Sequence, residues 1–90
     1  MKNKYKQEFL TILSTIKDLK LLDAFLTDVL TPNEYDEIVK RWQVVKQLNQ
    51  GITQRQIAKN LQISLAKISR GSRMLLNKNG GFNQLLKKKI

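Results

Sequence analysis

Apolar side chains recur every three or four positions through most of the chain, which is the spacing that lines one face of a helix. The first apolar stripe predicts a helix over about residues 5–18, and its members are Phe9, Ile12, Leu13, Ile16 and Leu19. A second stripe continues from Leu21 to Leu30. No segment alternates apolar and polar residues with a period of two, so the pattern predicts an all-α chain.

A strong helix-start signal follows the second stripe. Thr31 is a good N-cap residue, Pro32 suits the first helical position, and Glu34 completes a capping box. The predicted helix runs over about 32–49 and stops before Gly51, because glycine readily takes the left-handed conformation that ends helices. Its apolar positions are Tyr35, Ile38, Val39, Trp42, Val45 and Leu48.

Three shorter helices are predicted after Gly51, over about 54–60, 64–76 and 82–88. The first begins with a second capping box formed by Thr53 and Gln56, and the next has Ser64 as its N-cap. The breaker-rich segment 77–81 separates the last two helices. We therefore expect about six helices in one domain that spans 1–90.

Charge is distributed very unevenly along the chain. The net charge is +10, yet all seven acidic residues lie at or before Glu37. Residues 1–37 carry five lysines, which gives 5 − 7 = −2, and residues 38–90 carry 12 basic side chains and no acid. A field of one sign over half a domain attracts a polyanion, and nucleic acid is the commonest one inside cells. A merely solubilising surface is the alternative interpretation.

Composition narrows the classes of function further. The chain has no cysteine and no histidine, which removes thiol nucleophiles, the commonest general base and most zinc sites. We find no paired carboxylates suited to acid–base work, so we expect no enzyme, no catalytic residue and no metal site. No apolar run is long enough for a signal peptide or a membrane span, and we expect a soluble cytoplasmic protein.

The segment 54–70 has the pattern of a helix-turn-helix. Small Ala58 allows the two helices to cross closely. Gln62 stands at the turn position that usually holds glycine, so either it adopts a left-handed or similar conformation at some cost or the turn differs slightly. The residues expected to pack the pair are Ile57, Leu61, Ile63 and Ile68. An ordinary helical hairpin with this spacing is the alternative.

A helix-turn-helix directs the start of its second helix into the major groove, and the start of its first helix meets a phosphate. Arginine can bind guanine bidentately or hold a phosphate, and short side chains can approach bases, methyl groups or water. The candidate DNA-binding residues are Gln54, Arg55, Ser64, Ala66, Lys67, Ser69 and Arg73.

An ordered set of residues extends this pattern on both sides. It comprises Leu30-Thr31-Pro32-Asn33-Glu34, Arg41, Gly51, Thr53-Gln54-Arg55 and Ile68-Ser69-Arg70-Gly71-Ser72. The set covers about residues 28–76 and resembles the bacterial tryptophan repressor family. The resemblance implies an intertwined homodimer in which 1–50 and 82–90 form the dimerisation core and 53–76 form the DNA-reading head. It also implies a palindromic operator, control of tryptophan metabolism genes, and L-tryptophan as corepressor.

The resemblance implies particular ligand-binding residues as well. Arg41 and Arg70 match the two arginines that enclose the indole and neutralise the carboxylate, and Gly71 matches the residue that leaves space for the ring. Leu30 and Thr31 match the positions whose carbonyls receive the ammonium group from the partner subunit.

Some residues leave alternatives open. Met74 and Asp28 differ from the enterobacterial type near the pocket, and the segment 51–53 is one residue shorter. Arg41 can instead pair with Glu37, four residues earlier on the same helix face. Arg70 can instead hold a phosphate. The alternatives for the whole chain are a helix-turn-helix regulator with another effector or none, and a basic RNA-binding protein.

Overall fold

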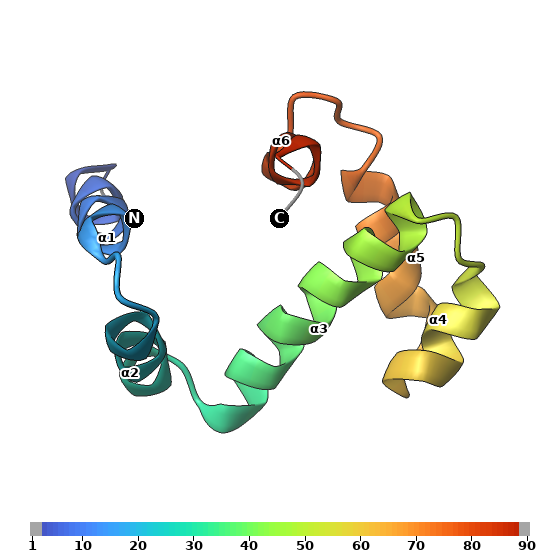
Figure 1. The fold of residues 1–90 in the computed structure, drawn as a ribbon, viewed down its shortest axis with the longest axis horizontal. Helices are drawn as coiled ribbons and strands as arrows, with labels where there is room; N and C mark the ends of the chain where they lie inside the picture. The colour runs from blue at the N-terminus through green and yellow to red at the C-terminus, as the bar shows by residue number, and fades with distance from the viewer. Residues whose placement is uncertain (1–2, 89–90) are drawn as a thin grey trace. The chain divides into compact units, whose positions relative to one another are not determined.

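The structure is a computed structural model that describes residues 3–88, and these residues form six α-helices and no strand (Figure 1). The helices are α1 (Asn3–Thr15), α2 (Leu19–Val29), α3 (Pro32–Asn49), α4 (Gln54–Leu61), α5 (Leu65–Met74) and α6 (Gly81–Lys87). The prediction of an all-α fold with about six helices is confirmed.

The chain divides into two compact units, Met1–Tyr35 and Asp36–Ile90. The first contains α1, α2 and the first turn of α3, and the second contains the rest of α3 with α4, α5 and α6. All the predicted DNA-binding residues and the two candidate ligand-binding arginines belong to the second unit.

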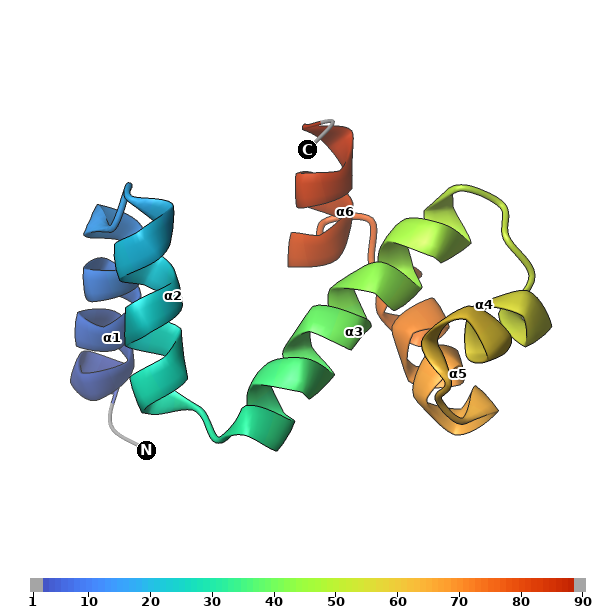
Figure 2. The same ribbon diagram turned by 60° about the horizontal axis from the view of Figure 1, so that its bottom comes forward.

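In the first unit, α1 and α2 lie side by side (Figures 1 and 2). The rings of Phe9 and Phe25 join them, with centroids 6.0 Å apart. The Tyr35 hydroxyl, at the start of α3, donates a hydrogen bond of 2.8 Å to Asp23 of α2. This bond to a carboxylate raises the pKa of Tyr35, because a phenolate beside Asp23 would lose the bond and meet a like charge.

The boundary between α1 and α2 differs from the sequence prediction. The first helix ends at Thr15 and not near residue 18, and Leu19 belongs to the first turn of α2. The reason is a local cap that we did not predict. The side chain of Asp18 accepts a hydrogen bond of 3.2 Å from the backbone N–H of Lys20 and thereby starts a new helix.

The predicted capping box at the start of α3 is confirmed. The hydroxyl of Thr31 accepts from the backbone N–H of Glu34 at 3.2 Å, and the Glu34 carboxylate accepts from the backbone N–H of Thr31 at 2.8 Å. The hydrogen bond from the backbone N–H of Thr31 to the carboxylate, with a smaller contribution from the Thr31 side chain, favours the ionised form and lowers the pKa of Glu34.

The core of the second unit lies where α3, α4 and α5 meet. Val44 of α3, Ile57 of α4 and Ile68 of α5 are buried, and the two isoleucines have an exposed fraction of 0%. The partly buried apolar residues that pack against these three are Leu48, Ile52, Ala58, Leu61 and Ile63. All four residues predicted to pack the helix-turn-helix, together with Ala58, therefore belong to this core.

The helix caps and the turn residue of the α4–α5 pair lie at the predicted positions. The hydroxyl of Thr53 caps α4 by accepting from the backbone N–H of Gln56 at 3.2 Å. The Gln56 side chain donates from Nε2 to Asn60 at 2.7 Å and does not accept from the backbone N–H of Thr53, so only half of the predicted capping box forms. Gln62 has a φ of 55° and a ψ of 49°, the left-handed conformation expected at the turn. Ser64 caps α5 with a 3.4 Å bond to the backbone N–H of Lys67.

The last helix, α6, begins and ends one residue before the predicted limits. The Asn83 amide donates to the carbonyl oxygens of Leu75 and Asn77, at 2.9 Å and 2.8 Å, which fixes α6 to the loop after α5. The ring centroids of Phe82 and Trp42 lie 6.4 Å apart, so α6 also contacts α3. The aromatic side chain of α6 thus lies beside Trp42 of α3.

Candidate ligand pocket and nucleic-acid interface

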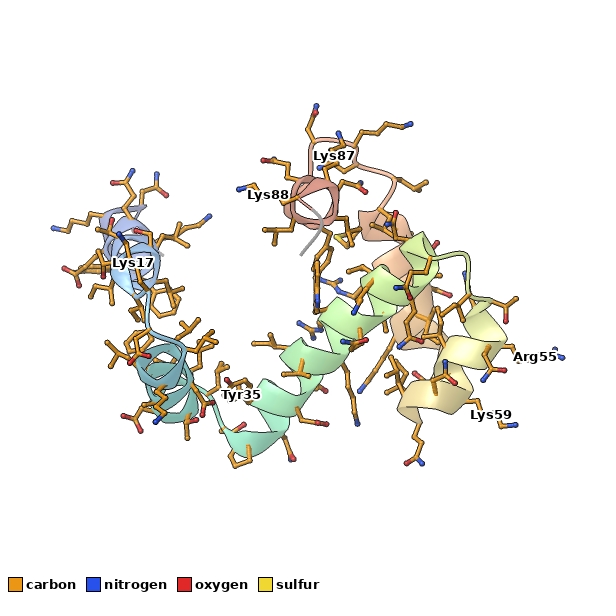
Figure 3. The ribbon with its side chains drawn as sticks, viewed as in Figure 1. Lys17, Tyr35, Arg55, Lys59, Lys87 and Lys88 are labelled. Atoms are coloured by element: carbon orange, nitrogen blue, oxygen red, sulfur yellow. The ribbon has the colours of Figure 1, made fainter. Side chains whose placement is uncertain are left out.

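The seven predicted DNA-binding residues are all exposed. Gln54 and Arg55 lie in the first turn of α4, and in Figure 3 the side chain of Arg55 extends away from the helix into solvent, as does that of Lys59. The other five lie on α5 or at its N-cap, namely Ser64, Ala66, Lys67, Ser69 and Arg73.

The burial of Ile68 decides which face of α5 is free. Ile68 has an exposed fraction of 0%, and its neighbours Lys67 and Ser69 lie about 100° away from it around the helix axis. One buried apolar side chain therefore holds α5 against α3 and α4. The exposed middle of the helix presents Ala66, Lys67, Ser69 and Arg73 to solvent, and Leu65 and Met74 are exposed at its two ends. This arrangement suits a helix that enters a groove of a polyanion.

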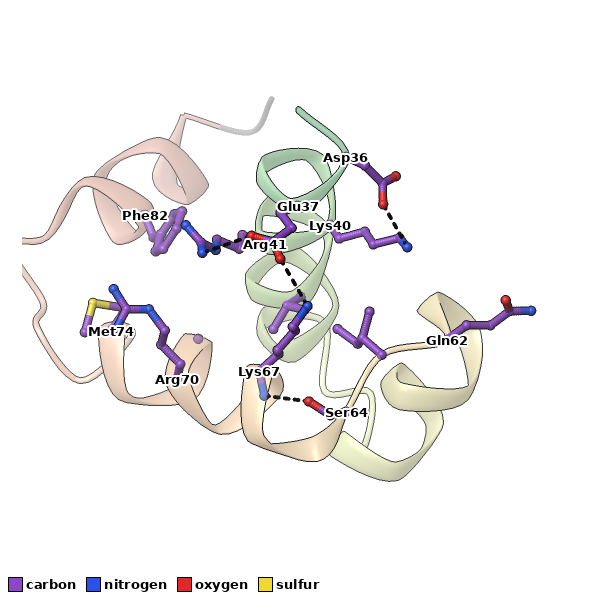
Figure 4. A pocket seen from close by; sticks show the side chains of 13 residues that line it. Asp36, Glu37, Lys40, Arg41, Gln62, Ser64, Lys67, Arg70, Met74 and Phe82 are labelled. Atoms are coloured by element: carbon purple, nitrogen blue, oxygen red, sulfur yellow. Dashed lines mark hydrogen bonds and ion pairs between the residues drawn. The ribbon is translucent and has the colours of Figure 1, made fainter. Parts of the chain in front are cut away.

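A pocket of about 340 Å³ lies between α3, α5 and the start of α6 (Figure 4). Pockets of roughly 300–1,000 Å³ are the usual size for small-molecule ligands. The lining residues are Asp36, Glu37, Lys40, Arg41, Val44, Gln62, Ile63, Ser64, Lys67, Arg70, Gly71, Met74 and Phe82.

Cations outnumber carboxylates in this pocket. Lys40 pairs with Asp36 at 3.0 Å. The carboxylate of Glu37 lies 3.6 Å from Arg41 and 3.3 Å from Lys67. Within residues 3–88, no carboxylate is within ion-pair distance of Arg70. The pocket therefore offers Arg70 and a weakly paired Arg41 to an incoming anion.

At Gly71, α5 lies very close to α3. A Cβ atom at this position would lie 2.8 Å from Cγ1 of Val44, which is closer than real Cβ atoms approach. Val44 is itself buried, with an exposed fraction of 2%, and its branched side chain has little freedom to move. The glycine is thus needed for this close crossing of α5 and α3, and both Gly71 and Val44 line the pocket.

Three of the five predicted ligand-binding residues meet in this pocket, namely Arg41, Arg70 and Gly71. Leu30 and Thr31 belong to the first unit and are not among the lining residues. The alternative partner of Arg41, Glu37, is also present at 3.6 Å, so Arg41 both lines the pocket and forms an ion pair.

Sequence reasoning missed Phe82, Lys40 and Gln62 as pocket residues. Phe82 lies far from Arg41 in the sequence, beyond the breaker-rich segment 77–81. No short-range pattern could therefore predict that the two side chains share a pocket. Lys40 could have been found, because it precedes Arg41 on the same helix. Gln62 reaches the pocket as the turn residue between α4 and α5.

Residues 3–88 contain no group of three or more carboxylate, histidine or cysteine side chains that could hold a metal ion. None of their helices combines the length and the apolar character that crossing a membrane requires.

The tight α4–α5 pair with its left-handed turn residue, packed on a longer helix, defines an all-α protein with a helix-turn-helix. A family profile described as "Trp repressor protein" matches residues 4–90. The chain belongs to the Trp repressor family. This is a family of regulatory proteins.

Curated relatives agree with the family assignment. The chain is 33% identical over 85 residues to a Trp operon repressor homolog of Chlamydia trachomatis serovar L2, which covers 93% of this chain and 90% of the relative. It is 36% identical over 83 residues to the Trp operon repressor homolog of Haemophilus influenzae, with 91% and 82% covered. For the homolog of Actinobacillus succinogenes, the identity is 42% over 67 residues, which are 73% of this chain and 66% of the relative. No solved structure matches the chain.

Proposed function

We propose that this chain is a transcriptional repressor that binds a palindromic operator as a homodimer, with L-tryptophan as its corepressor. The regulated genes would be those of tryptophan metabolism, and the site of action would be the cytoplasm. The observation that carries the proposal is the pocket that Arg41, Arg70 and Gly71 line directly behind the exposed helix α5. A ligand in this place adjoins the helix that would read DNA.

The second unit has the electrostatics that a DNA-reading head requires. From residue 38 onwards the chain carries 12 basic side chains and no acid. Arg55 lies in the first turn of α4, whose free backbone N–H groups favour a phosphate. Lys67 and Arg73 lie on α5, within reach of base edges or phosphates once α5 enters a major groove.

The pocket has the chemistry for a zwitterionic aromatic ligand. Planar guanidinium groups bind a carboxylate bidentately and also stack on an aromatic face, and the pocket holds two of them, Arg41 and Arg70. Phe82 and Met74 supply apolar and polarizable surface for an indole. Leu30 and Thr31 would come from the partner subunit, which is why their absence from the lining of a single chain is compatible with their proposed role.

A second copy of the chain would cover the apolar surface that one chain exposes. Large apolar side chains on α1, α2 and the start of α3 are strongly exposed, among them Leu10, Leu19, Leu21, Ile38 and Val39. Exposed apolar surface of this kind is typical of interfaces between proteins. Light scattering coupled to size-exclusion chromatography should therefore give twice the mass of the chain, and a monomer at micromolar concentration would contradict the proposed dimer.

The central test is the binding of a fluorescently labelled palindromic duplex of the tryptophan-operator type, followed by anisotropy. At about physiological ionic strength, where non-specific attraction is weakened, we expect the operator to bind more tightly than a scrambled duplex. L-tryptophan should strengthen only the operator complex. Specific binding that ignores L-tryptophan would retain the DNA-binding function and reject this corepressor. Preference for RNA over both duplexes would reject the repressor.

Arg55→Ala separates DNA binding from ligand binding. Because Arg55 is exposed on α4 and does not line the pocket, this change should weaken operator binding by about 1–3 kcal/mol and leave the affinity for L-tryptophan unchanged. Calorimetry measures the affinity for L-tryptophan, and fluorescence anisotropy measures the affinity for the operator.

The control for Arg55→Ala is Lys17→Ala, which removes the same charge from an exposed residue between α1 and α2. It should change operator binding far less. Arg70→Ala, in the pocket, should weaken both binding events. An equal loss of ligand and operator binding in Arg55→Ala would contradict the role given to Arg55.

A further inference from the structure

One carboxylate, that of Glu37, pairs both with a candidate DNA-binding residue and with a candidate ligand-binding residue. Glu37 of α3 places Oε1 3.3 Å from Nζ of Lys67 and Oε2 3.6 Å from Nη2 of Arg41 (Figure 4). Lys67 is a candidate DNA-binding residue in the first turn of α5, and Arg41 is a candidate ligand-binding residue. Lys67 and Glu37 are separated by 30 positions in the sequence.

Glu37 lies at the boundary between the acidic and the basic parts of the sequence. It is the last acidic residue of the chain, and the 12 basic side chains that follow it have no acid among them. The neighbouring carboxylate, Asp36, is engaged by Lys40 at 3.0 Å. Glu37 is therefore the carboxylate that pairs with cations of both the reading helix and the ligand pocket.

The N-terminal turn of α5, where Lys67 lies, also attracts other anions. The N-terminal turn of α5 carries the positive end of the helix dipole, and Lys67 adds a full charge there. A DNA phosphate that approaches this turn meets Glu37 already paired with Lys67, and the two negative groups repel each other. Likewise, a ligand carboxylate that approaches Arg41 meets the other oxygen of Glu37.

We propose that Glu37 is an internal competitor that occupies Lys67 and Arg41 in the free protein and is displaced by both DNA and the ligand. This inference rests on the proposed repressor function. Displacement by one ligand lowers the cost of displacement by the other, so Glu37 contributes positive coupling between L-tryptophan and the operator, and linkage makes that coupling reciprocal. The side chains of Glu37 and Lys67 are 48% and 58% exposed, which leaves both free to move.

The test compares operator and ligand affinities of the wild-type chain and Glu37→Gln. Exposed ion pairs contribute about 0.2–1 kcal/mol, which corresponds to at most about fivefold. We expect Glu37→Gln to bind the operator about two- to fivefold more tightly without L-tryptophan and to bind L-tryptophan more tightly without DNA. The factor by which L-tryptophan strengthens operator binding should fall.

Two further variants decide whether the effect passes through Lys67. Glu8→Gln removes the same charge from exposed α1, and its gain should be much smaller than that of Glu37→Gln. In a Lys67→Met background, Glu37→Gln should no longer tighten operator binding. An equal gain in Glu8→Gln, a gain that persists with Lys67→Met, or an unchanged coupling factor would each overturn the inference. Failure of the wild-type chain to prefer the operator would instead reject the proposed function itself.

Discussion

Ile68→Ala is expected to lower the free energy of unfolding by about 2–5 kcal/mol, the range for deleting a buried isoleucine side chain without collapse of the cavity. Ile68 has an exposed fraction of 0% and packs with Ile57 and Val44 at the meeting point of α3, α4 and α5. No other side chain of α5 is buried, so the cavity would remove the main anchor of the helix. A small domain has only about 5–15 kcal/mol in total, so the loss is a large share.

Urea unfolding followed by circular dichroism, at one protein concentration, measures this effect. The control is Leu65→Ala on the same helix, because Leu65 is 53% exposed and surface substitutions usually change stability by less than about 0.5 kcal/mol. Amide hydrogen exchange should show that α4 and α5 lose protection first. If Ile68→Ala were as stable as Leu65→Ala, the assignment of Ile68 to the core would be wrong.

Gly71→Ala is expected to destabilise the chain by about 1–3 kcal/mol, the usual cost of overpacking a well-filled contact. The new Cβ atom would lie 2.8 Å from Cγ1 of Val44, and Val44 is held by the surrounding core. This outcome is the reverse of the ordinary effect of glycine to alanine in a helix, which stabilises by about 0.5–1 kcal/mol. The close approach of Val44 therefore decides whether Gly71→Ala raises or lowers the free energy of unfolding.

The cause of the Gly71→Ala effect can be isolated with two comparisons. In a Val44→Ala background the same substitution should cost much less, because the opposing methyl group is gone, and the two changes should be non-additive. Gly81→Ala is the matched control, since a Cβ atom at Gly81 would meet nothing within 4 Å. Equal stability losses for Gly71→Ala in both backgrounds would reject the steric explanation.

Stability and the proposed function share residues in this protein. Val44 belongs to the core cluster and also lines the pocket, and Ile63 packs against the core while it lines the pocket. A ligand in the pocket would therefore contact the side chains that hold α5 in place. Binding free energy from these contacts would stabilise the orientation of the helix pair relative to α3, and this would be the physical route by which the proposed corepressor favours one arrangement of α4 and α5.

The sequence by itself determined the local features of the fold. Hydrophobic periodicity and helix-start signals predicted about six helices, and the caps at Thr31, Thr53 and Ser64 predicted where three of them begin. The left-handed conformation of Gln62 was one of the two alternatives expected at a turn position that usually holds glycine. These features depend on interactions within about four residues, so short stretches of sequence contain the information. The end of α1 was predicted wrongly because the cap at Asp18 was overlooked.

Only the tertiary structure decided which distant residues meet. The contact of Lys67 with Glu37, the approach of Phe82 to Trp42, and the steric reason for Gly71 all depend on how α5 and α6 pack against α3. No periodicity or cap encodes such contacts, because they arise when burial of Ile57, Ile68 and Val44 fixes the crossing of separate helices. The sequence thus indicated the helices and the family, and the packing of three buried side chains placed four cations and two carboxylates around a common pocket.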